Sequence, residues 1–416
     1  MGNRQVTAIL LGAGNRGAQA YASYALQYPE ELKFVGIAEP REERRNEFTK
    51  IHKIEEKYSV SSWEELLAFP RLADFILICT QDHMHMEPMM KAMELGYDIL
   101  VEKPISPKKE ELLRLKEQSA HYPGMLSVCH VLRYSPFFRK IKELLNQGTI
   151  GEIINIQHME SIGFWHMAHS FVRGNWRNTK ESSPIILAKT CHDFDILLWL
   201  TGKRCLRLSS FGSLRLFKPE MAPKGSAKRC TDGCPHRSSC EFYAPKFYLE
   251  HPKAIVDGYR KVVSMDPTPE GLMEALKTGP YGRCVYACDN DVADHQIVNM
   301  EMEDGLTISF TVSAFTNECE RIITIHGTKG EIRGRMEEDS IEVIDFLTGD
   351  KTHYQLNTPK VGHSGSDSMM MKELISLIAQ GKQQENISNA VQAIDSHLIA
   401  FAAEESRLNN GAVVEL

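Results

Sequence analysis

The chain has 416 residues, of which 42% are hydrophobic and 25% charged, and its formal net charge is −7. This length favours two domains, because a single hydrophobic core seldom serves more than about 250–300 residues. The mild acidity argues against a general nucleic-acid-binding protein, and no apolar run reaches the roughly 18 residues of a membrane span. Since the N-terminus shows no secretory signal pattern, we expect a cytoplasmic protein with neither a nucleic-acid nor a membrane partner.

The first 130 residues alternate between short apolar runs and amphipathic segments. This rhythm predicts a parallel sheet covered by helices on both faces, as in a dinucleotide-binding Rossmann domain spanning 1–130. Strands are predicted at 6–11, 34–38, 75–79 and 98–101. Helices are predicted at 16–27, 41–58, 63–69 and 85–95, with a further helix starting at Ser106-Pro107.

A glycine-rich motif lies at the first strand-to-helix turn. It reads Gly12-Ala13-Gly14-Asn15-Arg16-Gly17, and Glu39 follows 22 residues later at the end of the second strand. In a dinucleotide site the glycines let the backbone approach the pyrophosphate, the helix N-terminus supplies N–H groups, and the acid binds the ribose hydroxyls. The alternative is a tight turn without a ligand.

The choice between NAD and NADP depends on the end of this second strand. Glu39 favours NAD, because its carboxylate would repel a 2′-phosphate. Arg41, Arg44 and Arg45 follow closely and offer an alternative in which they neutralise that phosphate; otherwise they form a solvated helix face. We expect NAD, with NADP as the alternative.

The fourth strand runs into Glu102-Lys103-Pro104. Together with the glycine motif, this tripeptide resembles the Gfo/Idh/MocA family of glucose–fructose oxidoreductase and inositol dehydrogenase relatives. Further segments match in family order over nearly the whole chain. They are Thr80-Gln81-Asp82-His83-Met84-His85, Arg133 with Pro136, Gly148 with Gly151, Trp176-Arg177, His192-Asp193-Phe194-Asp195 and Gly327-Thr328-Lys329-Gly330.

The resemblance implies that Lys103 reaches the nicotinamide and the substrate and acts as the general acid or base. Removing a hydride from a carbinol carbon requires the hydroxyl proton to leave as well, so a positioned base is needed. His192 is the second catalytic candidate, and Asp195 is a candidate for fixing its tautomer. Thr80, His85 and Glu102 are expected beside the cofactor together with Asn15 and Arg16.

One position departs from the family pattern. Family dehydrogenases commonly carry an aspartate four residues before the histidine, where this chain has Ala188 followed by Lys189. A second lysine beside the site would change its electrostatics, so we include Lys189 among the catalytic candidates. The usual Lys–Asp–His proton relay is therefore in doubt.

Residues 131–416 predict an α+β substrate-binding domain with a large, mainly antiparallel open sheet. Asp304-Gly305 is a two-residue hairpin signal between two predicted strands. Family relatives use such a sheet for assembly, so a homodimer or homotetramer is expected. Strands are predicted at 153–160, 206–213, 296–303, 306–314, 321–326, 331–335, 340–347 and 353–356, and helices at 366–380 and 388–408.

An irregular insertion is predicted at about 217–280, and it contains Cys230, Cys234 and Cys240. Three thiols within a short loop of a reduced protein more often hold zinc than form disulfides. Cys284 is the favoured fourth ligand, ahead of Cys288, His236 and His251. Unliganded thiols, an iron–sulfur cluster or a redox pair are the alternatives.

The substrate cleft is expected to contain Arg177, Trp176, Asp291 and His295. Sugar hydroxyls need side-chain donors and acceptors, and aromatic rings stack on sugar faces. Each of these residues also has a purely structural interpretation as loop or core. Trp165, His166 and His169 are weaker candidates of the same kind.

The sequence thus predicts an NAD(P)-dependent dehydrogenase or reductase acting on a sugar, polyol or cyclitol. A second hypothesis is glycoside cleavage through transient oxidation and elimination, which consumes no net cofactor. A third, of another class, is a cofactor-sensing binding protein without catalysis.

Overall fold

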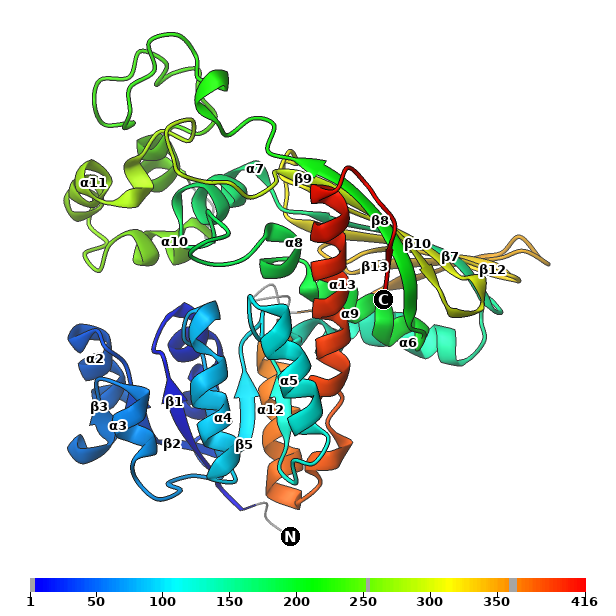
Figure 1. The fold of residues 1–416 in the computed structure, drawn as a ribbon, viewed down its shortest axis with the longest axis horizontal. Helices are drawn as coiled ribbons and strands as arrows, with labels where there is room; N and C mark the ends of the chain where they lie inside the picture. The colour runs from blue at the N-terminus through cyan, green and yellow to red at the C-terminus, as the bar shows by residue number, and fades with distance from the viewer. Residues whose placement is uncertain (1–3, 252–254, 359–364) are drawn as a thin grey trace.

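The structure is a computed structural model that describes residues 4–251, 255–358 and 365–416. It contains two separate sheets, one of six strands and one of nine. Figure 1 shows the smaller sheet with its helices in the lower half and the larger sheet fanning out at upper right. The Rossmann and α+β fold classes expected from the sequence are both present.

The six-stranded sheet is parallel throughout and has the order β3-β2-β1-β4-β5-β6. This is the doubly wound order in which a dinucleotide binds where the strand order reverses, beside the carboxyl end of β1. The central strands are buried on both faces, which explains their uninterrupted apolar runs. The strands are β1 Val6–Leu11, β2 Leu32–Ala38, β3 Ser59–Val60, β4 Phe75–Ile78, β5 Asp98–Val101 and β6 Leu126–Val128.

Several helix boundaries in this domain differ from the predicted ones. The helix expected over 41–58 ends at His52, because Lys53 turns into the left-handed region with φ of 53°. The helix expected from Ser106 begins at Lys109, and the Ser106 hydroxyl accepts a hydrogen bond from the backbone N–H of Lys108 instead. The helices are η1 Asn15–Tyr21, α1 Ser23–Gln27, α2 Glu42–His52, α3 Trp63–Leu67, α4 Met86–Glu94 and α5 Lys109–Ser119.

The nine-stranded sheet has the order β14-β13-β12-β11-β7-β10-β9-β8-β15. All neighbouring strands are antiparallel except β7 and β10, so the mainly antiparallel prediction is confirmed. Asp304 and Gly305 have φ of 57° and 73° between β9 and β10, as a tight hairpin requires. The strands are β7 Ile153–Ser161, β8 Cys205–Ser213, β9 His295–Met302, β10 Thr307–Ser313, β11 Glu320–Gly327, β12 Gly330–Arg335, β13 Ser340–Asp345, β14 Lys351–Gln355 and β15 Val414–Glu415.

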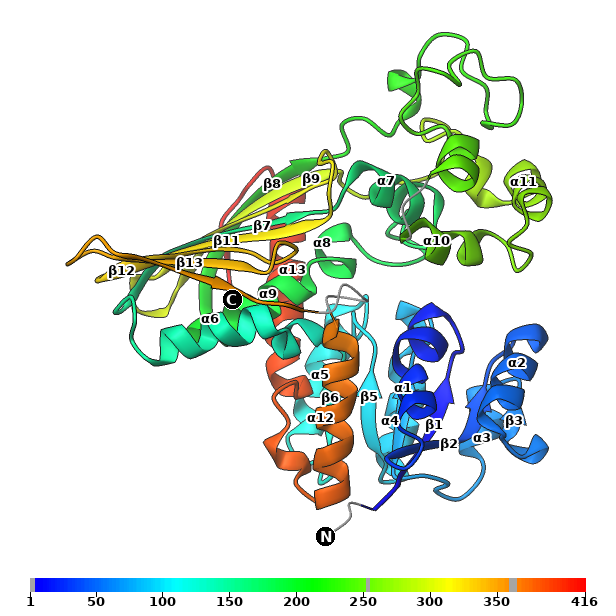
Figure 2. The ribbon, with the colours of Figure 1, turned by 180° about the vertical axis from the view of Figure 1, so that it is seen from behind.

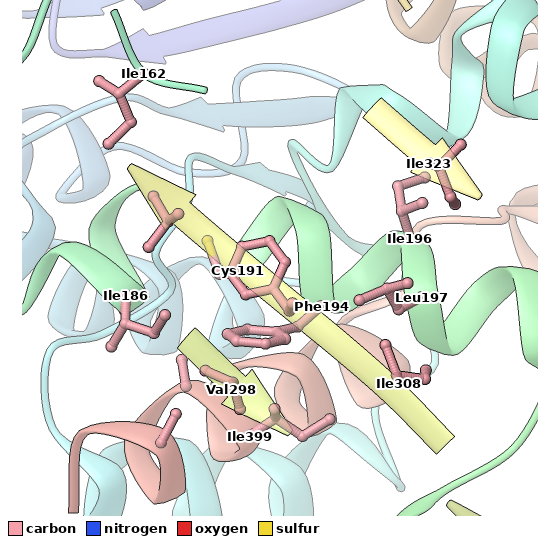
Figure 3. Close-up of a cluster of buried hydrophobic side chains, with 14 of the residues drawn as sticks. Ile162, Ile186, Cys191, Phe194, Ile196, Leu197, Val298, Ile308, Ile323 and Ile399 are labelled. Carbon is pink, nitrogen blue, oxygen red and sulfur yellow. The ribbon is translucent and has the colours of Figure 1, made fainter. Parts of the chain in front are cut away.

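Helix α9, Cys191–Thr201, lies in the main core and carries the candidate His192 in its first turn. Figure 3 shows its apolar side chains packed between the large sheet and the last helix. Phe194 of α9 is fully buried with Val298 of β9 and Ile399 of the last helix in the same cluster. This packing fixes the position of the first turn of α9.

The C-terminal helices return to the Rossmann domain, as Figures 1 and 2 show. Helix α12, Ser366–Gln380, packs its apolar face onto η1 and β1. The first half of α13, Ala390–Leu408, contributes to the Rossmann core, and its second half contributes to the core of the large sheet. The last 50 residues therefore link both domains behind the site.

The segment predicted as an irregular insertion contains two helices that the sequence analysis missed. They are α10, Ile255–Val263, and α11, Pro269–Thr278, and they lie away from the large sheet at upper left in Figure 1. None of the helices described is both long and apolar enough to cross a membrane. The outer face of the large sheet exposes Phe211 and Ile297, and assembly through this face stays a prediction.

Candidate active site

The three glycines of the motif differ in the space around them: Gly12 and Gly17 are crowded, whereas Gly14 is open. A Cβ on Gly12, whose φ is +89°, would lie 2.5 Å from the carbonyl oxygen of Cys79, and a Cβ on Gly17 would lie 2.3 Å from that of Gly12. A Cβ on Gly14 would meet nothing within 4 Å. Gly12 and Gly17 thus serve the packing of helix against strand, whereas Gly14 leaves open space where a pyrophosphate approaches.

Glu39 lies directly beneath this turn and is almost fully buried. Its carboxylate accepts hydrogen bonds from the backbone N–H groups of Ala13 (2.8 Å) and Arg41 (3.0 Å). The acid predicted to bind ribose hydroxyls is therefore fixed beside the glycine turn. The open Gly14 and the buried Glu39 together fit a dinucleotide.

The first turn of η1 is tied to the loop that carries Lys103. Arg16 pairs with Glu102 (2.8 Å) and with Asp367 of α12 (2.7 Å), and the Tyr21 hydroxyl donates to Glu102 (2.6 Å). Burial opposes ionisation of Glu102, but Arg16 and the neighbouring Lys103 outweigh it and lower the pKa of that carboxyl. Arg16 and Glu102 thus fix the loop geometry around the cofactor site.

Lys103 follows β5 and points toward the second domain. Its ammonium donates to the carbonyl oxygen of Ala188 at 2.9 Å. The same ammonium partly opposes the burial that raises the pKa of Cys191 to about 12. Ala188 ends the short helix α8, Ile185–Ala188, and lies three residues before α9, so Lys103 lies near the segment that carries His192; their shared role in catalysis stays a prediction.

Thr80 and His85 flank the same loop from the carboxyl end of β4. The His85 ring is buried, with Nδ1 2.9 Å from the carbonyl oxygen of Pro104 and Nε2 3.2 Å from that of Thr80. In the same loop after β4, Asp82 accepts a hydrogen bond from the Ser182 hydroxyl (2.8 Å) of the second domain. Nothing in the sequence indicates this contact between the two domains, whose partners lie 100 residues apart.

Lys189 belongs to a buried network of charged side chains. Its ammonium pairs with Glu160 (3.0 Å), and Arg321 pairs with the other oxygen of Glu160 (3.0 Å) and with Asp193 (2.9 Å). His158 Nε2 lies 2.8 Å from Asp193 as well. The positive charge of Lys189 is thus compensated by a carboxylate, which reduces its repulsion of Lys103.

Asp195 does not contact His192 through its carboxylate oxygens. Both oxygens accept hydrogen bonds from the guanidinium of Arg133 at 2.7 Å, and both residues are buried. Arg133 is therefore the partner of both Asp195 carboxylate oxygens, and the role considered for Asp195 beside His192 stays a prediction. His192 itself packs its ring 5.5 Å from that of His130.

Among the predicted substrate residues, Arg177 and Asp291 lie together, but their charged groups already bind neighbouring residues. Arg177 pairs with Asp289 (2.8 Å). Asp291 accepts hydrogen bonds from the backbone N–H and the hydroxyl of Thr179 (2.8 Å each). Trp176 remains partly exposed, and His295 contacts Asp294 at 2.8 Å. No contact joins His295 to the Lys103 loop among the interactions described.

The weaker aromatic candidates pack against the chain itself. His169 stacks between Tyr259 and Tyr281 with ring centroids at 4.1 and 4.7 Å, and its Nδ1 lies 2.7 Å from the Tyr248 hydroxyl. The Trp165 indole N–H donates to the carbonyl oxygen of Asn317 (3.1 Å). These contacts support the structural interpretation of both residues.

The predicted zinc ion is not supported. Cys230, Cys234, Cys240 and Cys284 do line one small cavity of about 20 Å³. Over the described part of the chain, however, no three Cys, His, Asp or Glu side chains are placed so that they could hold a metal ion.

Glu337 gives the charge network a measurable pH dependence. Burial raises the pKa of its carboxyl to about 7, with Glu160 adding to the shift and Arg321 opposing it. Since the unfolded pKa is lower, this group favours the folded state fully below about pH 4.5, and that contribution is lost as the pH rises through 7. Replacing it with glutamine removes an ionisation that costs about 3 kcal/mol at pH 8.

We therefore expect Glu337→Gln to melt close to wild type at pH 5 and a few degrees higher at pH 8. Differential scanning calorimetry across this range measures the difference. Glu338→Gln, at the exposed neighbouring position, is the control and is expected to show no such trend. A constant difference between wild type and Glu337→Gln at all pH values would contradict the raised pKa.

Comparison with known proteins gives consistent matches over most of the chain. Residues 6–130 match the model of an oxidoreductase family described as an NAD-binding Rossmann fold, GFO/IDH/MocA. Residues 142–416 match the C-terminal alpha/beta domain of the same family. Both halves of the chain thus match one family in the expected order.

Among curated proteins, the putative oxidoreductase YteT of Bacillus subtilis is 24% identical over 335 residues, covering 76% of this chain and 75% of the relative. The NAD⁺-dependent scyllo-inositol 2-dehydrogenase of Bacillus subtilis is 24% identical, covering 68% and 70%. A solved levoglucosan dehydrogenase in complex with NADH and levoglucosan is 18% identical, covers 99% of both chains and has a TM-score of 0.71. At this identity the structural likeness shows the fold alone.

Proposed function

Because the chain belongs to the Gfo/Idh/MocA family of NAD-binding oxidoreductases, we propose that it transfers a hydride between nicotinamide and a carbinol carbon of a sugar, polyol or cyclitol. The observation that carries the proposal is Lys103, held at the carboxyl end of the parallel sheet by the carbonyl oxygen of Ala188, three residues before α9. The names of two relatives, scyllo-inositol 2-dehydrogenase and levoglucosan dehydrogenase, support this substrate class.

Bound NAD supplies the hydride acceptor or donor, and the chain supplies the rest. Gly14 gives the pyrophosphate room and Glu39 binds ribose hydroxyls, which favours NAD over NADP. As the neutral amine, Lys103 takes the proton from the substrate hydroxyl in oxidation, and as the ammonium it gives a proton to the carbonyl oxygen in reduction. His192, at the start of α9, orients the same hydroxyl.

The proton pathway differs from that of relatives with an aspartate. The carbonyl oxygen of Ala188 orients the Lys103 ammonium but cannot itself take up a proton. Lys103 must therefore exchange its proton with His192 or with solvent. This feature also keeps open a cofactor-neutral reaction, in which a transiently oxidised glycoside eliminates its aglycone and the hydride returns.

A spectrophotometric screen at the absorbance band of NADH tests the proposal. Purified protein is mixed with NAD or NADP and a panel of sugars, polyols and inositols. We expect NADH to accumulate with at least one member of the panel and more slowly with NADP. If the cofactor binds but no NADH or NADPH accumulates, aryl glycosides of the sugars in the panel are tested for cleavage.

Three outcomes separate the hypotheses. Net NADH formation supports the dehydrogenase, and NAD-dependent cleavage without NADH supports the elimination reaction. Cofactor binding with neither reaction would overturn the proposed function and favour a cofactor-sensing protein.

A further inference from the structure

Helix α13 passes behind the loop that carries Lys103 and presents His397 to it. The His397 side chain is fully buried. Its Nε2 lies 3.0 Å from the backbone nitrogen of Ile105, and its Nδ1 lies 2.8 Å from the carbonyl oxygen of Ala393. Because a backbone N–H can only donate, Nε2 is the acceptor, and the ring proton is on Nδ1. Both ring nitrogens are therefore used, in one neutral tautomer.

The peptide group that joins Pro104 to Ile105 is held at both its polar atoms by imidazole rings from distant parts of the sequence. His85 contacts the carbonyl oxygen of Pro104 at 2.9 Å, and His397 accepts from the next N–H, that of Ile105. The N–H of Lys103 donates to its neighbour Glu102 at 2.9 Å. Three successive polar groups of this loop thus have fixed partners before any substrate binds.

The same helix also reaches the second catalytic candidate. The rings of His397 and His130 pack edge to face at 5.7 Å, and those of His130 and His192 do so at 5.5 Å. The three histidines form a continuous buried row from α13 to the first turn of α9. A displacement of His397 would therefore disturb both Lys103 and His192.

A purely space-filling role does not account for these contacts. An apolar side chain of similar size would fill the same volume without the cost of burying a polar ring. Burial lowers the pKa of His397 to about 3, so the ring stays a neutral acceptor over the working range. Compared with a leucine at the same position, His397 adds a hydrogen-bond acceptor for the backbone N–H of Ile105.

We propose that His397 is a positioning residue for proton transfer, which holds Lys103 in place through the N–H of Ile105. The inference deepens the proposed function and rests on it. A shift of about 1 Å in a reacting group can cost on the order of 100-fold in rate, so a single buried hydrogen bond to this loop has a measurable effect.

Three variants test the proposal. His397→Leu removes the acceptor, and His397→Gln returns an acceptor of similar reach. Ile399→Ala, on the same helix but in the core of the large sheet, is the control for lost packing. Steady-state kinetics use the substrate found by the screen, NADH binding is followed by fluorescence, and amide exchange of Ile105 is followed by mass spectrometry.

We expect His397→Leu to lower kcat about 10- to 100-fold, with NADH affinity within about threefold of wild type and faster exchange at Ile105. His397→Gln is expected to recover most of the lost kcat. Wild-type kcat in His397→Leu, a loss no larger than that of Ile399→Ala, or no recovery in a folded His397→Gln would each overturn the proposal.

The amide-exchange experiment needs no substrate, so it tests the positioning role of His397 independently of the proposed enzymatic function. If the screen finds no reaction but Ile105 exchanges faster only in His397→Leu, the proposed function fails and the loop contact stands. If Ile105 exchanges equally in all variants, the positioning role is wrong whatever the enzyme catalyses.

Discussion

Replacing Lys103 with methionine is expected to lower kcat about 1,000-fold while the protein still binds NADH. Methionine keeps the length and most of the volume of the side chain but removes the charge and the transferable proton. Loss of a general acid or base costs typically 100- to 10,000-fold. Because the ammonium contacts a carbonyl oxygen and not a buried carboxylate, its removal strands no unpaired charge, and folding should be preserved.

The measurement is kcat with the substrate identified by the screen, alongside NADH titration and thermal melting. Lys109→Met is the matched control, since Lys109 is an exposed lysine at the start of α5, a few residues beyond the same loop. The control should retain full activity. A Lys103→Met variant with more than about a tenth of wild-type kcat would rule Lys103 out as the proton-transfer group.

The cofactor half of the site could be predicted from the sequence because its signals are local. A glycine turn between strand and helix, with an acid at the end of the next strand, fixes backbone geometry within one βαβ unit. Glu39 lies where that pattern places it. The buried strands β1, β4 and β5 and the hairpin at Asp304 were predictable for the same reason, since each depends on residues adjacent in the chain.

The rest of the site depends on partners far apart in the sequence. Asp195 binds Arg133, 62 residues away, and His397 binds Ile105 across 292 residues. Spacing alone made Asp195 look like a partner of His192, three residues earlier on the same helix. His397 had only a weak signal, a histidine directly before the apolar run Leu398–Ala403 of α13, and nothing in the sequence indicates which backbone group it meets.

Substituting alanine for Gly14 is expected to weaken NADH binding at least 30-fold without destabilising the protein. Gly14 has φ of −73° and ψ of −172°, which alanine adopts without strain, and its added Cβ would meet nothing within 4 Å. A cofactor pyrophosphate, however, needs that space and the close approach of the backbone. A penalty of about 2 kcal/mol in binding corresponds to the 30-fold loss.

Gly17→Ala is the contrasting variant. Its Cβ would lie 2.3 Å from the carbonyl oxygen of Gly12, so η1 must shift away from β1, and the melting temperature should fall whether or not cofactor is present. Fluorescence titration with NADH and thermal melting of both apoproteins separate the two effects. If Gly14→Ala binds NADH within threefold of wild type, the pyrophosphate does not pass over Gly14. If it melts as low as Gly17→Ala, the open space at Gly14 is filled by the chain itself, and the argument that this glycine is kept for a ligand fails.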